Sequence, residues 1–149
     1  MTADISPILI SMRTAGASIA ITIVLGVFCA RGVVALRSER LRLLLDGLLT
    51  LPLVLPPTVA GFFLLYIFGV QRPLGSFLLE FFGWKVVFSW SATVLAAVVI
   101  SFPLMYRAAR GAFEQVDQDL IHAARTLGMS ERRIFWRIVM PLARPGVAA

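Results

Sequence analysis

The sequence contains few charged residues and few of the side chains that enzymes use for catalysis. Only 15% of its 149 residues are charged, and it has a single cysteine, Cys29, and a single histidine, His122. A lone cysteine excludes a disulfide within the chain. We find no nucleotide-binding loop, no cluster of metal ligands and no nucleophile beside a base. We therefore predict a protein that is not an enzyme and that has no catalytic residues, metal site or cofactor.

Hydrophobic residues make up most of the chain instead. They account for 59% of the sequence, and the mean hydropathy is +0.89. A water-soluble protein of this size would expose much of that apolar surface, at a cost of about 25 cal/mol per Å². The net charge is +6, but the arginines flank apolar runs and do not form the single basic face of a nucleic-acid-binding protein. The composition therefore predicts a membrane protein that does not bind nucleic acid.

The apolar runs predict an all-α, polytopic transmembrane fold. We expect membrane spans over about residues 14–36, 48–69 and 91–110, and the start of a fourth from about 134. Residues 70–90 are interrupted by charges and predict a short helix and loop at the membrane interface. Asp4 precedes the first basic residue, Arg13. The N-terminal segment therefore lacks the positive region of a signal peptide, and we expect it to be retained.

Prolines interrupt the second and third expected spans. Each proline removes a backbone N–H donor and pushes the preceding turn apart. Membrane helices tolerate this where neighbouring groups or pore water satisfy the freed carbonyls. For the second span the residues leave two alternatives open, a simple kink or a broken helix that lines a pathway. Our candidates for a translocation pathway are Pro52, Pro56, Pro57, Thr58 and Pro103.

The distribution of arginine predicts the orientation in the membrane. Residues 31–42 contain four arginines and residues 107–144 contain seven, whereas the connection between the second and third spans has only Arg72 and Lys85. Basic residues favour the cytoplasmic side. We therefore expect the first and third connections in the cytoplasm and the N-terminus in the periplasm. This topology explains Arg107 and Arg110 more simply than attraction of an anion would, and we nominate no ion pair within the spans.

The polar stretch from residue 111 to residue 137 predicts two short helices joined by a tight turn. Asp117 can cap the first helix, expected over residues 118–127, and Gly128 can end it in the left-handed conformation. Ser130 can cap the second helix, which we expect to end at Pro141. The first helix has a slim apolar face formed by Leu120, Ala123, Ala124 and Leu127. On physical grounds this face suits either docking of a partner or rest on lipid headgroups.

The spacing across this stretch resembles the cytoplasmic signature of permease subunits of ATP-binding cassette importers, Glu-Ala-Ala-x3-Gly-x9-Ile-x-Leu-Pro. Five signature positions are matched, by Ala123, Ala124, Gly128, Ile138 and Pro141. Two differ, since His122 replaces the glutamate and Met140 the leucine. Methionine conserves the volume of leucine, whereas His122 removes a carboxylate that would pair with the ATPase. The runs "LPLVLPPTVAGFFLL" and "FSWSATVLAAVVISFPLMYRAARGAFEQVD" look like those of bacterial molybdate permeases.

The resemblance implies one half of an importer in the bacterial inner membrane. Two permease copies would form the pore, cytoplasmic ATPase subunits would hydrolyse ATP, and a periplasmic binding protein would deliver molybdate or tungstate. The helix over residues 118–127 would be the coupling helix in an ATPase groove. The implied docking residues are His122, Ala123, Ala124, Arg125, Leu127, Gly128, Ile138 and Pro141.

Two alternatives to a molybdate permease remain from the sequence. Sulfate and thiosulfate permeases are similar around the "LPLVLPP" run, which leaves the oxyanion open. A non-transporting membrane protein whose basic loop binds lipid or a soluble partner is the alternative of another class. Permeases of this kind continue past the signature with at least two further crossings, whereas eight residues follow Pro141 here. We therefore expect residues 1–149 to be a permease domain that is incomplete at its C-terminus.

Overall fold

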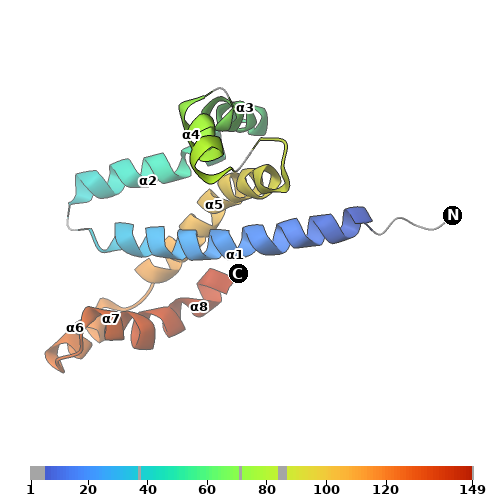
Figure 1. Ribbon diagram of the computed structural model, residues 1–149. Helices are drawn as coiled ribbons and strands as arrows, with labels where there is room; N and C mark the ends of the chain where they lie inside the picture. The colour runs from blue at the N-terminus through green and yellow to red at the C-terminus, as the bar shows by residue number, and fades with distance from the viewer. Residues whose placement is uncertain (1–5, 37, 71, 84–86, 149) are drawn as a thin grey trace. The chain divides into compact units, whose positions relative to one another are not determined.

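The regular structure is helical throughout the part of the chain that the structure describes. The computed structural model describes residues 6–36, 38–70, 72–83 and 87–148. Its elements are α1 (Ser6–Val34), α2 (Glu39–Val54), α3 (Pro57–Phe68), α4 (Pro73–Phe82), α5 (Trp90–Glu114), α6 (Gln118–Thr126), α7 (Glu131–Ile134), the π-helical turn η1 (Phe135–Val139) and α8 (Met140–Ala148), shown in Figure 1. The prediction of an all-α fold is confirmed.

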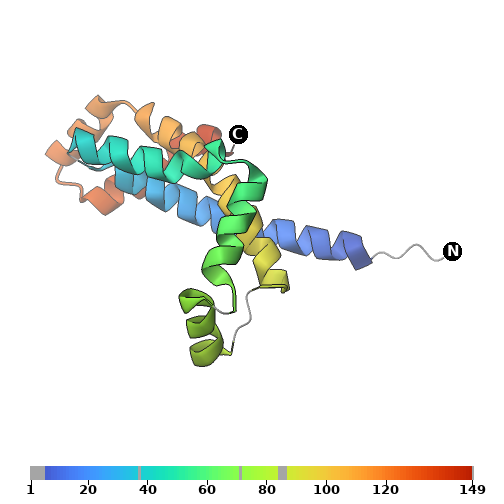
Figure 2. The same ribbon diagram turned by 90° about the horizontal axis from the view of Figure 1, so that it is seen from above.

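The described residues form two compact units. The first consists of the residues up to Ile23 together with Leu51–Phe102, and the second of Val24–Thr50 together with the residues from Pro103 onward. Helices α1, α2 and α5 each contribute residues to both units. In the first unit α4 follows α3 and contacts it near the C-terminal end of α3 (Figures 1 and 2).

Two helices in the described residues are long and apolar enough to cross a membrane, α1 and α5. Helix α1 covers the first expected span but starts at Ser6, eight residues before the expected start. Residues 8–10 are apolar and no proline follows them, so nothing in the sequence stops the helix there. Helix α5 covers the third expected span and continues to Glu114 with Pro103 inside it.

The second expected span is two helices rather than one. Helices α2 and α3 are bent by 109° relative to each other, with Leu55 and Pro56 between them. Pro56 is the N-cap of α3 and Pro57 its first residue, a place where a missing N–H breaks no helical hydrogen bond. A simple kink is therefore wrong, and the broken helix is the arrangement that the structure adopts. Helix α2 also begins earlier than expected, at Glu39.

In the first unit, α1 packs against α5 through a row of small hydroxyl side chains. The row recurs every four residues and so lies on one face of α1, where Thr14, Ser18 and Thr22 are buried. Three contacts to α5 hold it: the Trp90 indole donates to Thr14 Oγ1 (2.9 Å), the Ser18 hydroxyl donates mainly to the Thr14 carbonyl of its own helix (2.7 Å) and weakly to the Val94 carbonyl (3.5 Å), and the Thr22 and Ser101 hydroxyls are 3.0 Å apart. Small and hydroxyl residues of this kind mediate helix packing in membranes.

In the second unit the same face of α1 continues with Gly26 and Ala30. Ala30 is fully buried. A Cβ added to Gly26 would lie 2.7 Å from Met105 Cγ and 3.3 Å from the Tyr106 backbone nitrogen of α5. The two backbones therefore approach closely at Gly26, and a larger residue has no room there.

The close approach at Gly26 predicts that Gly26→Val destabilises the protein. We expect a loss of about 1–3 kcal/mol, the usual cost of overpacking a filled interface. Gly32→Val is the matched control, because a Cβ at Gly32 would meet nothing within 4 Å. Thermal unfolding in detergent, followed by the reaction of the free thiol of Cys29 with a fluorogenic maleimide, measures both. Equal midpoints for the two variants would contradict the close approach.

Candidate functional site

Helix α6 has nine residues, and hydrogen bonds cap it at both ends. At its start the Asp117 side chain accepts from the Asp119 N–H at 2.9 Å, which confirms the predicted cap. At its end Gly128 has φ +76°, as predicted, and its N–H donates to the Arg125 carbonyl (3.0 Å), while the Met129 N–H donates to the Ala124 carbonyl (3.1 Å). This pair of bonds is the Schellman motif. A helix this short is marginal alone, so these closures matter to its shape.

The apolar face expected on α6 is divided in the structure. Ala124 is buried, with 4% of its surface exposed, whereas Leu120 is 48% and Leu127 81% exposed. Ala123 is also exposed. Ala124 therefore fixes α6 to the rest of the unit. Leu120, Ala123 and Leu127 remain as an outward apolar row at the spacing i, i+3, i+7, which share one side of a helix.

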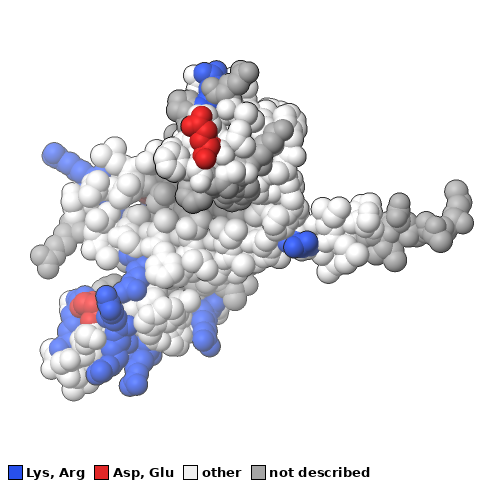
Figure 3. Space-filling view, viewed as in Figure 1, with Lys and Arg blue, Asp and Glu red and all other residues white. Residues whose placement is uncertain are grey.

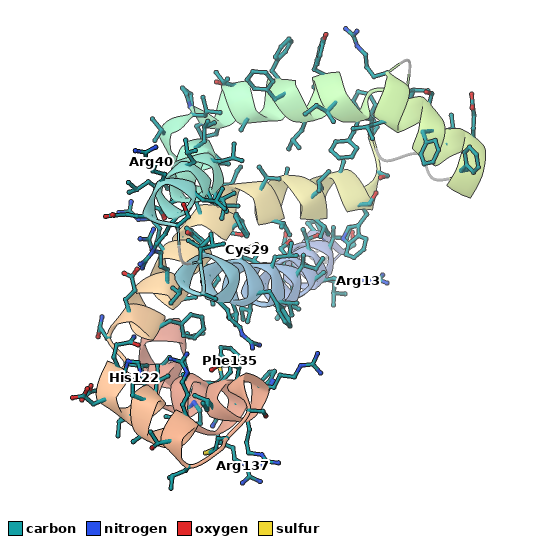
Figure 4. The ribbon with its side chains drawn as sticks, turned by 90° about the vertical axis from the view of Figure 1, so that its left-hand side faces the viewer. Arg13, Cys29, Arg40, His122, Phe135 and Arg137 are labelled. Atoms are coloured by element: carbon teal, nitrogen blue, oxygen red, sulfur yellow. The ribbon has the colours of Figure 1, made fainter. Side chains whose placement is uncertain are left out.

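Polar side chains flank this apolar row. His122 is exposed on α6 (Figure 4). Arg125 holds Glu131 of α7 through two hydrogen bonds, Nε to Oε1 at 2.7 Å and Nη2 to Oε2 at 3.2 Å. The hydrogen bond from Arg125 lowers the pKa of the Glu131 carboxyl and raises the pKa of Arg125 in turn. Both groups are therefore charged at neutral pH, and their pair joins the two sides of the turn.

Phe135 anchors the hairpin, which we define as residues 117–139, to the rest of the second unit. Its ring packs edge-on against Phe113 of α5, with centroids 5.7 Å apart. The Arg31 guanidinium carbon of α1 lies 3.9 Å from the Phe135 ring centroid, a cation–π contact. Ile134 beside it is 2% exposed. Burial of this aromatic residue and its neighbour ties the hairpin to the two long helices.

The second helix of the hairpin does not end at Pro141, contrary to our prediction. It continues through η1 into α8, to Ala148. Within η1 the Met140 N–H donates to the Phe135 carbonyl, five residues earlier. Proline normally clashes with the carbonyl four residues before it, and the wider π-helical turn that contains Arg137 relieves this clash. Ser130 is the N-cap residue of α7 as predicted, but its side chain makes no capping hydrogen bond.

The π-helical turn also decides which side of α8 is buried. Ile134 and Ala143 are each 2% exposed. Nine residues of regular α-helix would place them about 180° apart, whereas one extra residue in the turn brings them within about 80°. A Cβ added to Gly146 would lie 2.8 Å from Ala112 Cβ of α5. The turn thereby directs the small residues of α8 toward the interior.

The candidate pathway residues belong to both units, with Pro103 in the second and the others in the first. Pro52 lines an apolar groove of about 320 Å³ with residues such as Phe63 and Val99. Thr58 is exposed and is absent from the groove lining. Pro103 is buried in the second unit. An apolar groove offers an oxyanion no hydrogen-bond donor, and the pathway role of these positions stays a prediction.

A charged cluster between α2 and α5 was missed by the sequence reasoning. In the second unit Arg110 forms ion pairs with Asp46 and Glu114, and Arg42 also pairs with Glu114. The Tyr106 hydroxyl donates to Asp46 Oδ1 at 3.0 Å. Two arginines thus face two carboxylates, so Arg110 is neutralised and is not free to attract an anion. The i, i+4 spacing of Arg110 and Glu114 was the available signal.

Comparison with known proteins places these features in a family. The family described as "Binding-protein-dependent transport system inner membrane component" matches residues 22–149. Three relatives are similar over nearly the whole chain: the molybdenum transport system permease protein ModB of Escherichia coli K12 (43% identity, 94% of this chain), ModB of Haemophilus influenzae (40%, 98%) and the putative molybdenum transport system permease protein YvgM of Bacillus subtilis (37%, 95%).

The chain is shorter than these relatives. The matched regions span 61% of the Escherichia coli protein, 63% of the Haemophilus influenzae protein and 62% of the Bacillus subtilis protein. A further relative is the probable sulfate transport system permease protein cysT of Chlorokybus atmophyticus, which is 35% identical over 70% of this chain and 36% of its own length.

The left-handed conformation at Gly128 predicts a difference between two substitutions. Gly128→Val strains the backbone by about 1–2 kcal/mol, whereas Gly128→Asn is better tolerated because asparagine visits this conformation. We expect faster hydrogen exchange of the α6 amides in the valine variant and near-native exchange in the asparagine variant. Mass spectrometry of the detergent-solubilised chain measures this. The prediction fails if both variants protect α6 equally.

Proposed function

The chain belongs to the family of binding-protein-dependent transport system inner membrane components, and we propose that it is the permease subunit of an ATP-binding cassette importer for molybdate. The observation that carries this proposal is the capped helix α6, whose apolar row of Leu120, Ala123 and Leu127 is exposed within the matched region. Membership of a family of transport components argues against a non-transporting protein with a lipid-binding loop.

In this proposal α6 is the coupling helix and inserts into a groove of a cytoplasmic ATPase. Its apolar row would contact the groove, and the small side chain of Ala123 would let the ATPase approach the backbone. His122 is exposed at the position of the signature glutamate and offers an imidazole hydrogen bond in place of a carboxylate. The remaining signature residues Gly128, Ile138 and Pro141 would act by shaping the hairpin: Gly128 is in its turn, and Ile138 is half-buried in η1.

The importer that we propose contains two copies of this permease, ATPase subunits in the cytoplasm and a periplasmic protein that delivers molybdate or tungstate. The arginine-rich hairpin would lie in the cytoplasm and the N-terminus in the periplasm, as the distribution of basic residues favours. Closure of the ATPase on ATP would displace α6. Because Phe135 packs on Phe113 and beneath Arg31, this displacement would be passed to α5 and α1 as a rigid-body movement.

The choice of molybdate rests on relatives, because the described residues contain no oxyanion site that we can assign. Three relatives named for molybdenum transport are 37–43% identical. The sulfate permease from Chlorokybus atmophyticus is 35% identical over a smaller part of the chain. Sulfate is therefore the second candidate, and both are tetrahedral oxyanions of the same charge.

The exposed row of α6 predicts that Ala123→Trp abolishes binding of the ATPase. The indole would hold the groove away from the helix, whereas the exposed position leaves the fold intact. Ala108→Trp is the matched control, because Ala108 is an exposed alanine of α5 outside the hairpin. The measurement is co-purification of the ATPase from cells that express both proteins. Since that ATPase is cytosolic, binding also reports the orientation, and undiminished binding by Ala123→Trp would remove the docking role.

The cargo proposal predicts uptake of labelled molybdate by cells without their own molybdate transporter. These cells would express the completed permease that contains residues 1–149, with the ATPase and binding protein of the same organism. Excess tungstate should compete with the label and excess sulfate should not, and Ala123→Trp should give no uptake. Competition by sulfate but not by tungstate would reassign the cargo. Absence of uptake of both anions by the completed permease would contradict the proposed transport of these oxyanions.

A further inference from the structure

The outward side of α7, η1 and α8 carries arginines that are not used in ion pairs. We call Arg132, Arg133, Arg137 and Arg144 the arginine row; all four are exposed. Within the described ranges none of them pairs with a carboxylate, whereas Arg42, Arg110 and Arg125 each do. Basic side chains gather over the α6–α8 region at the lower left of Figure 3. The row therefore has four positive charges available to a ligand from outside the chain.

An exposed tryptophan stands among these arginines. Trp136 is 59% exposed, and its ring meets Phe135 edge-on with centroids 5.4 Å apart. The π-helical turn η1 contains one residue more than a regular α-helical turn. With that residue left out of the count, Trp136 and Arg144 are two turns apart and point within about 20° of each other. Tryptophan is enriched where membrane meets water, because its ring is apolar and its N–H is polar. The indole thus shares one side of the helix with the end of the row.

The row lies opposite the buried side of the same helix. Phe135 points inward and Arg137 points outward from the hairpin, as Figure 4 shows. From Arg133 to Arg144 the helix rises about 16 Å, from the polar hairpin into α8, where Met140, Leu142 and Val147 follow. A row of cations that runs from a polar loop into an apolar helix beside a tryptophan is placed to cross the headgroup layer.

We propose that the last part of the arginine row, Arg137 and Arg144, binds with Trp136 the headgroups of anionic phospholipids in the membrane leaflet next to the hairpin. Guanidinium groups hold phosphate oxygens through paired hydrogen bonds, and the long stem of Arg144 lets its charge reach the headgroups from a deeper position. The indole of Trp136 would lie along the upper part of the acyl chains.

The position of Arg144 favours lipid over the ATPase as the occupant. Arg144 is seven residues, or about 11 Å of helix, beyond Arg137, on the side away from the hairpin turn. The ATPase is proposed to meet α6, whose exposed row ends at Leu127. A protein bound at α6 would reach the first arginines of the row, whereas a lipid beside α8 reaches the last ones. The inference goes beyond the proposed function, since lipid binding does not require that α6 couples to an ATPase.

Fluorescence of Trp136 tests the site in the full chain. With Trp84→Phe and Trp90→Phe, Trp136 is the only tryptophan, because the sequence has three. The chain is placed in nanodiscs that contain a small fraction of phosphatidylglycerol or phosphatidylcholine with brominated acyl chains, which quench nearby indoles. We expect stronger quenching by brominated phosphatidylglycerol at equal mole fraction. Equal quenching by the two lipids overturns the proposal.

Two double variants distinguish a specific phospholipid site from general attraction between arginines and anionic lipid. Arg137→Gln with Arg144→Gln should weaken the preference for phosphatidylglycerol, by about fivefold for each arginine removed. Arg40→Gln with Arg107→Gln removes the same charge at exposed arginines outside the row and should leave the preference unchanged. An equal loss in both pairs would show only a general effect of charge and overturn the site.

The test must also distinguish lipid from the ATPase as the ligand of the arginine row. Co-purification of the ATPase with Arg137→Gln/Arg144→Gln should equal that of the native chain. A lost ATPase with an unchanged lipid preference would assign the row to the ATPase and overturn the lipid site. Failure of Ala123→Trp to affect the ATPase bears on the coupling helix alone, so the two proposals fail separately.

Discussion

Two apolar helices in a bilayer gain no hydrophobic stabilisation from touching each other, because lipid is as apolar as their side chains. The structure depends on close approach and polar contact instead. Small residues recur at every fourth position of α1 from Thr14 to Ala30, and those with hydroxyl groups bond to α5. At Gly26 the absence of a side chain brings the two backbones together. The close approach at Gly26 positions α5, and α5 ends three residues before the Asp117 cap. The contact between α1 and α5 therefore also fixes where the hairpin begins.

Local hydrogen bonds and an ion pair set the shape of α6, and only a small part of the hairpin is buried against the long helices. Helix α6 buries little besides Ala124, so its shape relies on the Asp117 cap, the Gly128 turn and the Arg125–Glu131 pair. Its attachment to the long helices comes from Ile134 and Phe135 in the following segment. A partner can therefore meet a helix of defined shape whose apolar row is still exposed. The proposed coupling role requires such a division between a shape set locally and an anchor set by packing.

Features of the fold that depend on neighbouring residues in the sequence were predictable. The Asp117 cap and the left-handed Gly128 follow from residue type and position, and both occur. The break at Pro56 was one of two open alternatives, because proline indicates a disruption without giving its angle. The prediction that the second helix of the hairpin ends at Pro141 was wrong, because its continuation depends on η1, for which the sequence has no simple signal. The cluster around Arg110 was missed because Asp46 and Arg110 are 64 positions apart and meet only after α2 and α5 pack. The docking residues and the pathway residues stay predictions.

The π-helical turn before Pro141 contains one residue more than a regular α-helical turn would. Deleting one residue from Phe135–Val139 would let the helix close as regular α-helix while α8 kept its rotational phase, but it would restore the clash between the ring of Pro141 and the carbonyl four residues before it. The same deletion inside α8 would turn everything after it by about 100° and carry Ala143 and Gly146 away from α5. A deletion at this turn would therefore cost the relief of the proline clash, whereas a deletion on its C-terminal side would cost the packing of α8 on α5. Spacing in the signature would then record the geometry of the helix and not only the identity of its contacts.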